Sequence, residues 1–562
     1  MVLRVDRIEG GSGFDVAVIG TGAAGLAAAL FAAKRGARVL VLERTEHVGG
    51  SSAWSAGTAW LPLTRHAAVG AGDDAATVLE FLDTAVGNRS PRAMREAFVA
   101  AAPQAVAELE GDTQVRFRAR AFHPDYMSDL PGATPCGRAI EPQPFDGRLL
   151  GDNLRLVRPP IPEFTLFGGM MVDRDDIGHL LKATKSFASF RRALGLLARY
   201  GHDRLTHSRG TRLVMGNALI ARFLASLADH DVTLLTGAEI GRLDHDGARV
   251  TGLGFSHRGR EISTTVRRGV VLASGGFNRH ATRRGERLGT DPAWCPGAPG
   301  HTGAALDLAL GLGARFGAGA LSDAFWAPVS TRRRADGSSA VFPHFLLDRG
   351  KPGMVTVDRS GRRFVNESTS YHLFALAMCD AGAVPAFLVT DAVGLKRYGL
   401  GMVRPGGGTA RFLADGYLTT AATLDELAAK LDIDGDGLMR TVADMNAYAI
   451  TGIDPDFGRG STVYQRANGD ATHGQNPCLG PIGAAPFYAV RLWPGDIGAA
   501  TGLVTDGHAR VLDPDDRPIG GLHAVGNDMQ SIMGGTYPAP GITLGPGIAF
   551  AWAAARHLMG EA

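Results

Sequence analysis

The sequence predicts an α/β protein in which a discontinuous, Rossmann-like nucleotide-binding domain carries an inserted α+β domain. Three observations lead to this prediction. A glycine-rich βαβ pattern opens the chain, two later strands also end in glycines, and a segment with strands and helices of its own lies between those two strands. We expect residues 1–277 and 449–562 to form the nucleotide-binding domain, and residues 278–448 to form the inserted, capping domain.

The opening unit reads as strand, turn, helix and strand. FDVAVIG at 14–20 is an apolar run typical of a buried strand, and the alanine-rich segment at 23–34 is typical of a helix. RVLVLE at 38–43 predicts the second strand. Together they form the βαβ unit that binds a dinucleotide in many α/β proteins.

The turn of this unit has the pattern Gly20-x-Gly22-x-x-Gly25. Gly20 permits the tight turn, Gly22 lets the backbone approach a pyrophosphate, and Gly25 lets the helix pack closely on the strand. Glu43 follows the last glycine by 18 residues and can accept hydrogen bonds from ribose hydroxyls. The helix N-terminus then faces the phosphates.

Two further strands end in glycine, VVLASGG at 270–276 and IGGLHAVGND at 519–528. Between them, GMVTVDRSGRRFVNE predicts a hairpin with its turn at Ser360-Gly361, followed by a helix capped by Ser368 or Thr369. The segment at 423–450 predicts two helices. These local elements are the basis for placing a separate domain inside the nucleotide-binding domain.

We expect no metal site. The cysteines Cys136, Cys295, Cys379 and Cys478 lie far apart in the sequence, which indicates free thiols rather than a metal or disulfide framework. DIDGDG at 432–437 resembles half of a calcium-binding loop, but the twelfth position is alanine instead of glutamate. A capped turn between two helices explains this stretch better.

The composition is that of a soluble globular protein, with 45% hydrophobic and 20% charged residues. The formal net charge of +2 provides no general field for nucleic acid. The N-terminus lacks an apolar signal segment, and the longest apolar run, at 16–33, is interrupted by glycine and threonine, so we expect a cytoplasmic protein. The basic amphipathic helix predicted at 184–200 is favoured as a solvated helix, with a peripheral membrane or oligomer contact as the alternative.

As a set, these motifs resemble the fumarate reductase/succinate dehydrogenase flavoprotein superfamily. The set consists of the glycine-rich turn, Gly49-Gly50-Ser51-Ser52, VVLASGGF, RRFVNE at 362–367, and GND followed by GITLGP at 541–546. Within that superfamily the chain is most similar to the 3-ketosteroid dehydrogenase branch, from about residue 14 to 557.

The resemblance implies an FAD-binding domain with a substrate domain inserted in it. The expected FAD contacts are Gly20, Gly22, Ala23, Ala24, Gly25, Glu43, Arg44, Gly50, Ser51, Ser52, Ile240, Ser274, Gly275, Asn527, Thr543 and Leu544. In covalently flavinylated relatives a histidine stands near the position of Ser52, so the resemblance implies non-covalent FAD here.

The resemblance also implies the type of substrate. The dicarboxylate enzymes of the superfamily place an arginine four residues after the glutamate of FVNE, whereas this chain has Tyr371 four residues after Glu367. Loss of that fixed cation favours a neutral carbonyl compound. In the ketosteroid branch, a tyrosine after FVNE is the base, a tyrosine and a backbone N–H near the final motif bind the ketone, and a tyrosine from an early loop supports the base. The matching residues in this chain are Tyr371, then Tyr537 with Gly541, and Tyr126.

We therefore expect an FAD-dependent dehydrogenase that introduces a C=C bond next to a ketone, with a 3-ketosteroid as the foremost substrate and either Δ1 or Δ4 regiochemistry. Tyr371 would take the α-proton and the flavin N5 would receive hydride, before an external acceptor reoxidises the flavin. Two alternatives remain open. One is a flavoprotein that reduces an enone or an unsaturated acid, and the other is a flavin electron carrier without a substrate of its own.

Overall fold

A nine-stranded sheet forms the nucleotide-binding part of the molecule. The computed structural model describes residues 3–8, 13–69, 72–345 and 348–561. The main path of the sheet is β1-β9-β3-β2-β12-β11-β10, and β20 pairs with β12 and β19. The strands are β1 (Arg4–Val5), β2 (Phe14–Ile19), β3 (Val39–Glu43), β9 (Val232–Thr236), β10 (Ala238–His245), β11 (Val250–His257), β12 (Arg260–Leu272), β19 (Arg510–Leu512) and β20 (Pro518–Ala524).

The start, middle and end of the chain meet in this sheet. β12 runs parallel to both β2 and β20, and its Val270 pairs with Ala17 on one side and Leu522 on the other. The α/β fold with a discontinuous Rossmann-like domain, expected from the glycine-ended strands, is confirmed by this parallel core.

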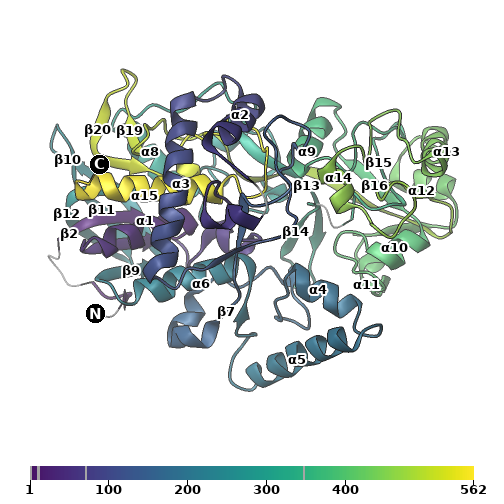
Figure 1. The fold of residues 1–562 in the computed structure, drawn as a ribbon, viewed down its shortest axis with the longest axis horizontal. Helices are drawn as coiled ribbons and strands as arrows, with labels where there is room; N and C mark the ends of the chain where they lie inside the picture. Colours follow the sequence, from purple (N-terminus) through teal and green to yellow (C-terminus); the bar gives the residue numbers. More distant parts are fainter. Residues whose placement is uncertain (1–2, 9–12, 70–71, 346–347, 562) are drawn as a thin grey trace.

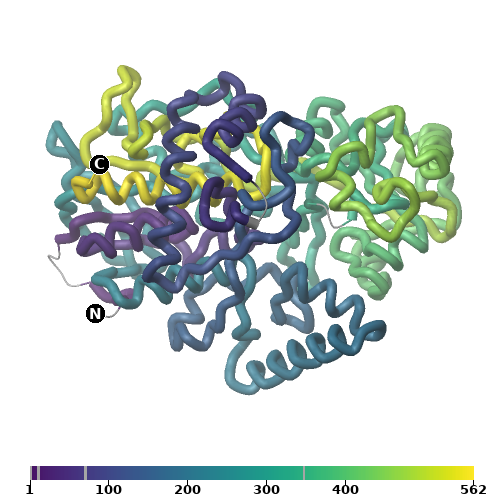
Figure 2. The backbone as a smooth tube through the Cα atoms, in the orientation of Figure 1, coloured from purple at the N-terminus to yellow at the C-terminus, as the bar shows by residue number. Residues whose placement is uncertain are grey.

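Helices cover the sheet on the side of the glycine-rich turn. α1 (Ala23–Lys34) contacts α15 (Leu544–Met559) and α6 (Met215–Leu227), and α15 contacts α3 (Arg92–Asp112). Figure 2 shows the C-terminal segment lying beside the N-terminal one. Apart from Ala24, which lines the cavity described below, the alanines of α1 have almost no exposed surface, so this helix can be enclosed by its neighbours.

A six-stranded antiparallel sheet forms the second part of the molecule (Figure 1). Its main path is β14-β13-β18-β16-β15, and β17 pairs with β18. These strands are β13 (Ala324–Arg333), β14 (Ser339–Pro343), β15 (Met354–Val357), β16 (Ala386–Thr390), β17 (Thr419–Ala421) and β18 (Phe487–Ala499). β18 lies beyond residue 448, so this sheet extends past the end that we expected for the inserted domain. Pro494 and Gly495 interrupt the apolar pattern of β18, which hid this central strand from the sequence interpretation.

The prediction of a hairpin around Ser360-Gly361 is wrong. The turn exists, since the Gly361 N–H donates to the Asp358 carbonyl at 3.1 Å, but β15 pairs with β16 instead of with the residues after the turn. Arg363 and Glu367 form a buried ion pair in this segment, with Nη2 and Oε2 2.7 Å apart. Their side chains therefore do not point to alternate faces as those of strand residues do.

The prediction of the residue that caps the next helix is also wrong. α9 (Tyr371–Asp380) is capped by Ser370, not by Ser368 or Thr369. The two later helices are confirmed as α12 (Leu424–Leu431) and α13 (Gly435–Thr451). Asp434 caps α13 by accepting from the Gly437 N–H, so the acidic stretch at 432–437 is a capped turn.

The remaining elements connect or flank the two sheets. They are α2 (Ala75–Val86), β4 (Ala59–Trp60), β5 (Phe117–Ala119), β6 (Ala139–Pro142), β7 (Phe145–Asp146), β8 (Arg212–Leu213), α4 (Arg174–Leu181), α5 (Phe187–Asp203), α7 (Arg283–Arg287), α8 (Ala304–Gly311), α10 (Ala392–Tyr398), α11 (Ala410–Ala414) and α14 (Val463–Asn468). Among the described residues, no helix combines the length and the apolar character needed to cross a membrane.

Candidate active site

A cavity of about 690 Å³ extends from the glycine-rich turn of the nucleotide-binding sheet to residues of the second sheet and α9. One end is formed where β2, β3 and β12 finish, which is where α/β sheets bind their ligands. The other end is lined by aromatic residues. A single cavity thus joins a nucleotide-type site to an aromatic pocket.

The glycines of the turn fit the close approach of a dinucleotide. Gly20 has φ +110°, and a Cβ there would lie 2.2 Å from the Ala273 carbonyl oxygen. A Cβ on Gly25 would lie 2.1 Å from the Gly20 carbonyl oxygen. Gly25 is not among the cavity-lining residues, so it acts in packing α1 against the turn, whereas Gly20 and Gly22 face the cavity.

The N-terminus of α1 opens toward the same cavity. The N-cap residue is Gly22, which has no side chain to cap the helix. The Ala23 N–H donates to Ser52 Oγ at 3.1 Å. Ala23 and Ala24 both line the cavity. A helix N-terminus with glycine in front of it is suited to hold a diphosphate.

Glu43 lies where β3 ends and is buried beside the cavity. Its Oε1 accepts from the Thr45 N–H at 2.9 Å and from Thr45 Oγ1 at 2.6 Å, and its Oε2 accepts from Thr21 Oγ1. These bonds fix the carboxylate at the strand end. Arg44 and Ile240 line the neighbouring wall.

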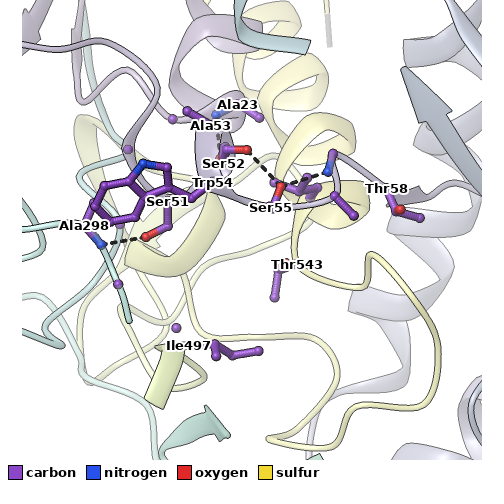
Figure 3. A pocket seen from close by; sticks show the side chains of 18 of the residues that line it. Ala23, Ser51, Ser52, Ala53, Trp54, Ser55, Thr58, Ala298, Ile497 and Thr543 are labelled. Atoms are coloured by element: carbon purple, nitrogen blue, oxygen red, sulfur yellow. Dashed lines mark hydrogen bonds between the residues drawn. The ribbon is translucent and has the colours of Figure 1, made fainter. Parts of the chain in front are cut away.

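The segment after Gly50 lines the middle of the cavity (Figure 3). Ser51 Oγ accepts from the Ala298 N–H at 2.8 Å, and Ser55 Oγ donates to the Ser52 carbonyl at 2.8 Å. The first bond ties the segment to the wall formed by Ala298, and the second holds the turn within the segment. The remaining expected contact residues, Ser274, Gly275, Asn527, Thr543 and Leu544, also line the cavity.

His301 lines this part of the cavity and was missed by the sequence interpretation. Burial, followed by the charges of Arg158 and Arg279, lowers the pKa of His301 to about 4. Gly275 has φ +95°, and a Cβ there would lie 2.6 Å from the imidazole ring, so the turn needs glycine at this position. The contact joins segments that are distant in sequence, and no local motif indicated it.

Three tyrosines meet at the other end of the cavity. Tyr126 Oη and Tyr371 Oη are hydrogen bonded at 3.4 Å, and the Tyr371 ring centroid lies 5.1 Å from that of Tyr537. The rings of Tyr126 and Tyr537 are stacked with centroids 5.9 Å apart. Gly541 lies on the same wall. The structure thus brings together all four residues that the resemblance implied for catalysis.

Different elements position these residues. Tyr371 begins α9, where the Ser370 cap fixes the first turn. The loop of Tyr126 is held to the Tyr537 turn by two bonds, from the N–H groups of Tyr126 and Met127 to the Pro538 carbonyl, at 2.8 and 3.0 Å. The positions of Tyr371 and Tyr126 are therefore fixed by a helix cap and by backbone hydrogen bonds.

Gly541 supplies a second kind of donor. Its φ is +87°, and a Cβ there would lie 2.5 Å from the Thr58 carbonyl oxygen, so the position needs glycine. Its carbonyl accepts from the Trp60 N–H at 3.0 Å, while its own N–H forms no hydrogen bond within the described residues. A free N–H on a cavity wall can bind an oxygen atom of a ligand.

The tyrosines are neutral at physiological pH. Burial, together with the neighbouring phenols, raises the pKa of Tyr126 and of Tyr371 well above the usual value of 10. Burial also raises the pKa of Tyr537. Each hydroxyl can thus donate a hydrogen bond to a ligand oxygen.

Further residues of the pocket were not found from the sequence. The Tyr464 ring lies 4.8 Å from that of Tyr126, and its buried hydroxyl has no partner among the described residues. Phe325 and Phe345 contact Tyr537 and Tyr371 edge-on, with centroids 5.2 and 4.9 Å apart. These are single aromatic residues outside any motif, so only the folded chain reveals them.

Two cations also line the aromatic end. Lys351 Nζ donates to the carbonyls of Asn468 and Gly469, each at 2.7 Å, and burial lowers the pKa of Lys351. Arg174 is exposed at the start of α4 and forms no ion pair within the described residues. The aromatic pocket thus has cationic groups on its wall.

Comparison with known proteins agrees with this geometry. Residues 15–544 match the FAD binding domain family. The chain is 36% identical to a 4-oxocyclohex-2-ene-1-carboxylate 5-dehydrogenase of Sinomonas cyclohexanicum, over 97% of this chain and 93% of that protein. It is 33% identical to a 3-oxosteroid 1-dehydrogenase of Mycolicibacterium smegmatis, over 98% of each chain.

A solved structure shows the same likeness in three dimensions. The 3-ketosteroid Δ1-dehydrogenase of Sterolibacterium denitrificans, in complex with 1,4-androstadiene-3,17-dione, superposes with a TM-score of 0.91 at 34% identity, over 98% of this chain and all of that chain. The glycine-rich turn, the open helix N-terminus and Glu43 fit the FAD that this family binds. The chain therefore belongs to the FAD binding domain family, in the 3-ketosteroid dehydrogenase branch of the fumarate reductase/succinate dehydrogenase flavoproteins, and is an FAD-dependent dehydrogenase.

Proposed function

We propose that this dehydrogenase introduces a C=C bond next to the carbonyl group of a cyclic ketone. The observation that carries the proposal is the meeting of three phenols with the free Gly541 N–H on one wall of the cavity. Tyr371 and Tyr537 are buried, and Tyr126 is half-buried. Such an arrangement offers two donors to a ketone oxygen and a separate oxygen atom to receive a proton. It lies in the same cavity as the FAD-type site.

Tyr537 and Gly541 bind the ketone oxygen in this proposal. The phenol is neutral and donates one hydrogen bond, and the backbone N–H donates the second. Both bonds strengthen as the oxygen gains negative charge, which acidifies the α-hydrogen. Removing one donor of this kind typically costs about 10²–10³ in rate.

Tyr371 removes the α-proton in its minor, deprotonated form, after its own hydroxyl proton has passed to solvent, and Tyr126 is its positioning partner. The hydrogen bond between the two hydroxyls, at 3.4 Å, lets Tyr126 stabilise the charge on the Tyr371 oxygen when it acts as a base. FAD, when bound, supplies the two-electron acceptor for the hydrogen that leaves the β-carbon.

The FAD contacts are the residues that line the other end of the cavity. Gly20, Gly22 and the N-terminus of α1 would hold the diphosphate, and Glu43 would accept from the ribose. Ser52, which is bonded to the Ala23 N–H, stands where a linking histidine would be needed. We infer that the cofactor is held without a covalent bond and is reoxidised by an external acceptor.

A 3-ketosteroid is the first candidate substrate, supported by the 3-oxosteroid 1-dehydrogenase relatives and the apolar pocket. A 4-oxocyclohexanecarboxylate is the second candidate. Lys351 and Arg174 line the pocket and could bind a carboxylate remote from the ketone, and two relatives at 36% and 35% identity are named for such oxo acids.

The two candidates are separated by steady-state kinetics with matched ketones. We would measure kcat/KM for a 3-ketosteroid, for 4-oxocyclohexanecarboxylate and for its methyl ester, in the parent and in Lys351→Met. If the oxo acid is the substrate, the ester and the variant both lose kcat/KM. If the steroid is the substrate, it is turned over best and Lys351→Met leaves its kcat/KM unchanged. Turnover of none of these ketones would contradict the proposal.

A further inference from the structure

Trp60 is a fully buried residue behind the cavity wall that carries Gly541. It belongs to β4, and its two N–H groups bond two different segments of the chain. The backbone N–H donates to the Gly541 carbonyl at 3.0 Å, and the indole Nε1–H donates to Asp125 Oδ1 at 2.8 Å. Asp125 directly precedes Tyr126. A single residue thus links the turn of the proposed ketone donor to the loop of the supporting phenol.

The backbone of Trp60 packs tightly against the segment that enters α15. A Cβ on Gly541 would lie 2.8 Å from the Trp60 nitrogen, and a Cβ on Gly545 would lie 2.0 Å from the Trp60 carbonyl oxygen. Glycine at both positions therefore allows a close approach that leaves the turn no room to shift. The place of the free Gly541 N–H is set by its contact with Trp60.

The indole ring of Trp60 is enclosed by other side chains. It is stacked on Phe98, with ring centroids 6.0 Å apart, and it makes a tilted contact with Phe81 at the same distance. Phe81 and Phe98 belong to α2 and α3, which pack together (Figure 1). The guanidinium carbon of Arg138 lies 5.7 Å from the ring centroid. These contacts fix the ring, and with it the direction of the indole N–H.

The Asp125 carboxylate, which accepts the indole bond on Oδ1, is also buried. Its Oδ2 accepts from the Thr134 N–H and from Arg138 Nη1, each at 3.1 Å. Arg138 forms a bidentate pair with Asp73 as well, with Nε–Oδ2 and Nη2–Oδ1 distances of 2.7 and 2.6 Å. Charge-assisted bonds of this kind fix a buried carboxylate in one place. The loop is therefore anchored immediately before the phenol.

The same loop is anchored on the other side of Asp125 as well. The N–H groups of Tyr126 and Met127 both donate to the Pro538 carbonyl, at 2.8 and 3.0 Å. With this contact alone, the loop is free to turn about one carbonyl oxygen. The bond between Trp60 and Asp125 removes that freedom, so we expect it to affect catalysis as well as stability.

We propose that Trp60 and Asp125 are positioning residues, which hold the Tyr126 loop at a fixed place relative to the ketone-binding turn. Neither residue lines the cavity, so both act through their neighbours. Tyr126 Oη is bonded to Tyr371 Oη at 3.4 Å, and Tyr371 is the base in the proposed function, on which this inference rests. A ketone held by Gly541 meets that base correctly only while the loop and the turn keep their separation. A shift of about 1 Å in such a site can cost about 10²-fold in rate.

Trp60→Phe in the FAD-loaded protein tests the inference, because it removes the indole N–H and keeps the backbone bond to Gly541. We expect kcat for the best cyclic ketone to fall about 10–100-fold, while KM changes less than about twofold because the ketone donors are unchanged. Asp125→Asn is the second variant. An amide cannot accept at both oxygen positions, so kcat should fall in the same way, and Arg138 keeps its pair with Asp73.

Trp552→Phe is the matched control. The Trp552 indole N–H also donates to a carboxylate, Glu108 Oε2, at 2.8 Å, and Trp552 does not line the cavity. This variant loses the same kind of bond, so its Tm should fall while kcat and KM stay at the parent values. A parent-like kcat in both Trp60→Phe and Asp125→Asn would overturn the inference, and if Trp60→Phe does not fold, the kcat of Asp125→Asn decides alone.

A double-mutant cycle identifies the residue through which Trp60 acts. If it acts through Tyr126, Trp60→Phe should lower kcat little further in a protein that already carries Tyr126→Phe. Losses that multiply in full would show that Trp60 acts independently of Tyr126, which would overturn the inference.

Fluorine NMR tests the positioning without turnover, in FAD-loaded protein with 3-fluorotyrosine in place of Tyr126. We expect the same resonance in the parent and in Trp552→Phe, and a shifted or split resonance in Trp60→Phe. An unchanged resonance in Trp60→Phe would overturn the positioning role. A changed resonance, in a protein whose parent form turns over no cyclic ketone, would refute the proposed function and leave the positioning of Tyr126 intact.

Discussion

Tyr371→Phe is the substitution that separates catalysis from binding at this site. It removes one hydroxyl and keeps the ring, whose centroid lies 4.9 Å from that of Phe345 and 5.1 Å from that of Tyr537. The hydroxyl accepts a hydrogen bond from Tyr126 Oη at 3.4 Å. The free energy of unfolding should therefore fall by about 1 kcal/mol, the net value of one hydrogen bond.

The effect on turnover should be much larger. A positioned base contributes about 10²–10⁴ in rate, which corresponds to about 3–5 kcal/mol of activation free energy. The ketone donors Tyr537 and Gly541 are unchanged in this variant. We thus expect ketone ligands to bind and perturb the flavin spectrum almost as in the parent, while reduction of the flavin nearly stops.

The assay is anaerobic stopped-flow absorbance, which follows flavin bleaching at saturating ketone. Tyr398→Phe is the matched control, because Tyr398 lies outside the cavity and bonds Asp470 at 2.7 Å. It should bleach at the parent rate. If Tyr371→Phe bleached at nearly the parent rate, Tyr371 would be a packing residue, and the base would be sought at Tyr126.

Four further predictions follow from the same geometry. Tyr537→Phe should weaken ketone binding as well as slow bleaching, and the fall in kcat/KM should correspond to about 3–4 kcal/mol of lost transition-state stabilisation. An unchanged KM would contradict the assignment of Tyr537 as a donor. Burial holds the pKa of Tyr371 above 10, and a base must be deprotonated. We therefore expect kcat/KM to rise about tenfold for each pH unit between about pH 6 and about pH 9. A flat pH profile would exclude a phenol base. Gly20→Ala should yield protein without flavin or insoluble protein, because the new Cβ meets the Ala273 carbonyl at 2.2 Å; yellow protein with an unchanged Tm would refute the role of the turn. Acid should release FAD intact, as expected with Ser52 in place of a histidine, and a yellow precipitate would show a covalent bond.

Much of the nucleotide-binding part could be predicted because its signals are local. The turn glycines, the helix of α1 and Glu43 fall within one short segment, and their spacing follows from a single βαβ geometry. The tyrosines were found by the motifs around them. Their meeting on one cavity wall depends on the fold, and their catalytic roles stay a prediction.

The parts that were missed depend on long-range contacts. The absence of the hairpin follows from the pairing of β15 with β16, which the residues near Ser360 do not reveal. Tyr464 reaches the pocket from α14, and Lys351 is held there by the carbonyls of Asn468 and Gly469; neither residue has a motif. Such residues become visible only when the sheets and loops are assembled.

The measurement that tests the central claim most directly is anaerobic reduction of the flavin by a cyclic ketone deuterated at the α-carbon. We predict that the unlabelled ketone bleaches the flavin and yields a product two hydrogens lighter. The α-deuterated ketone should bleach it more slowly, and succinate and NADH should leave the absorbance unchanged. Bleaching by succinate or NADH, with no bleaching by any 3-ketosteroid or 4-oxocyclohexanecarboxylate, would contradict the account.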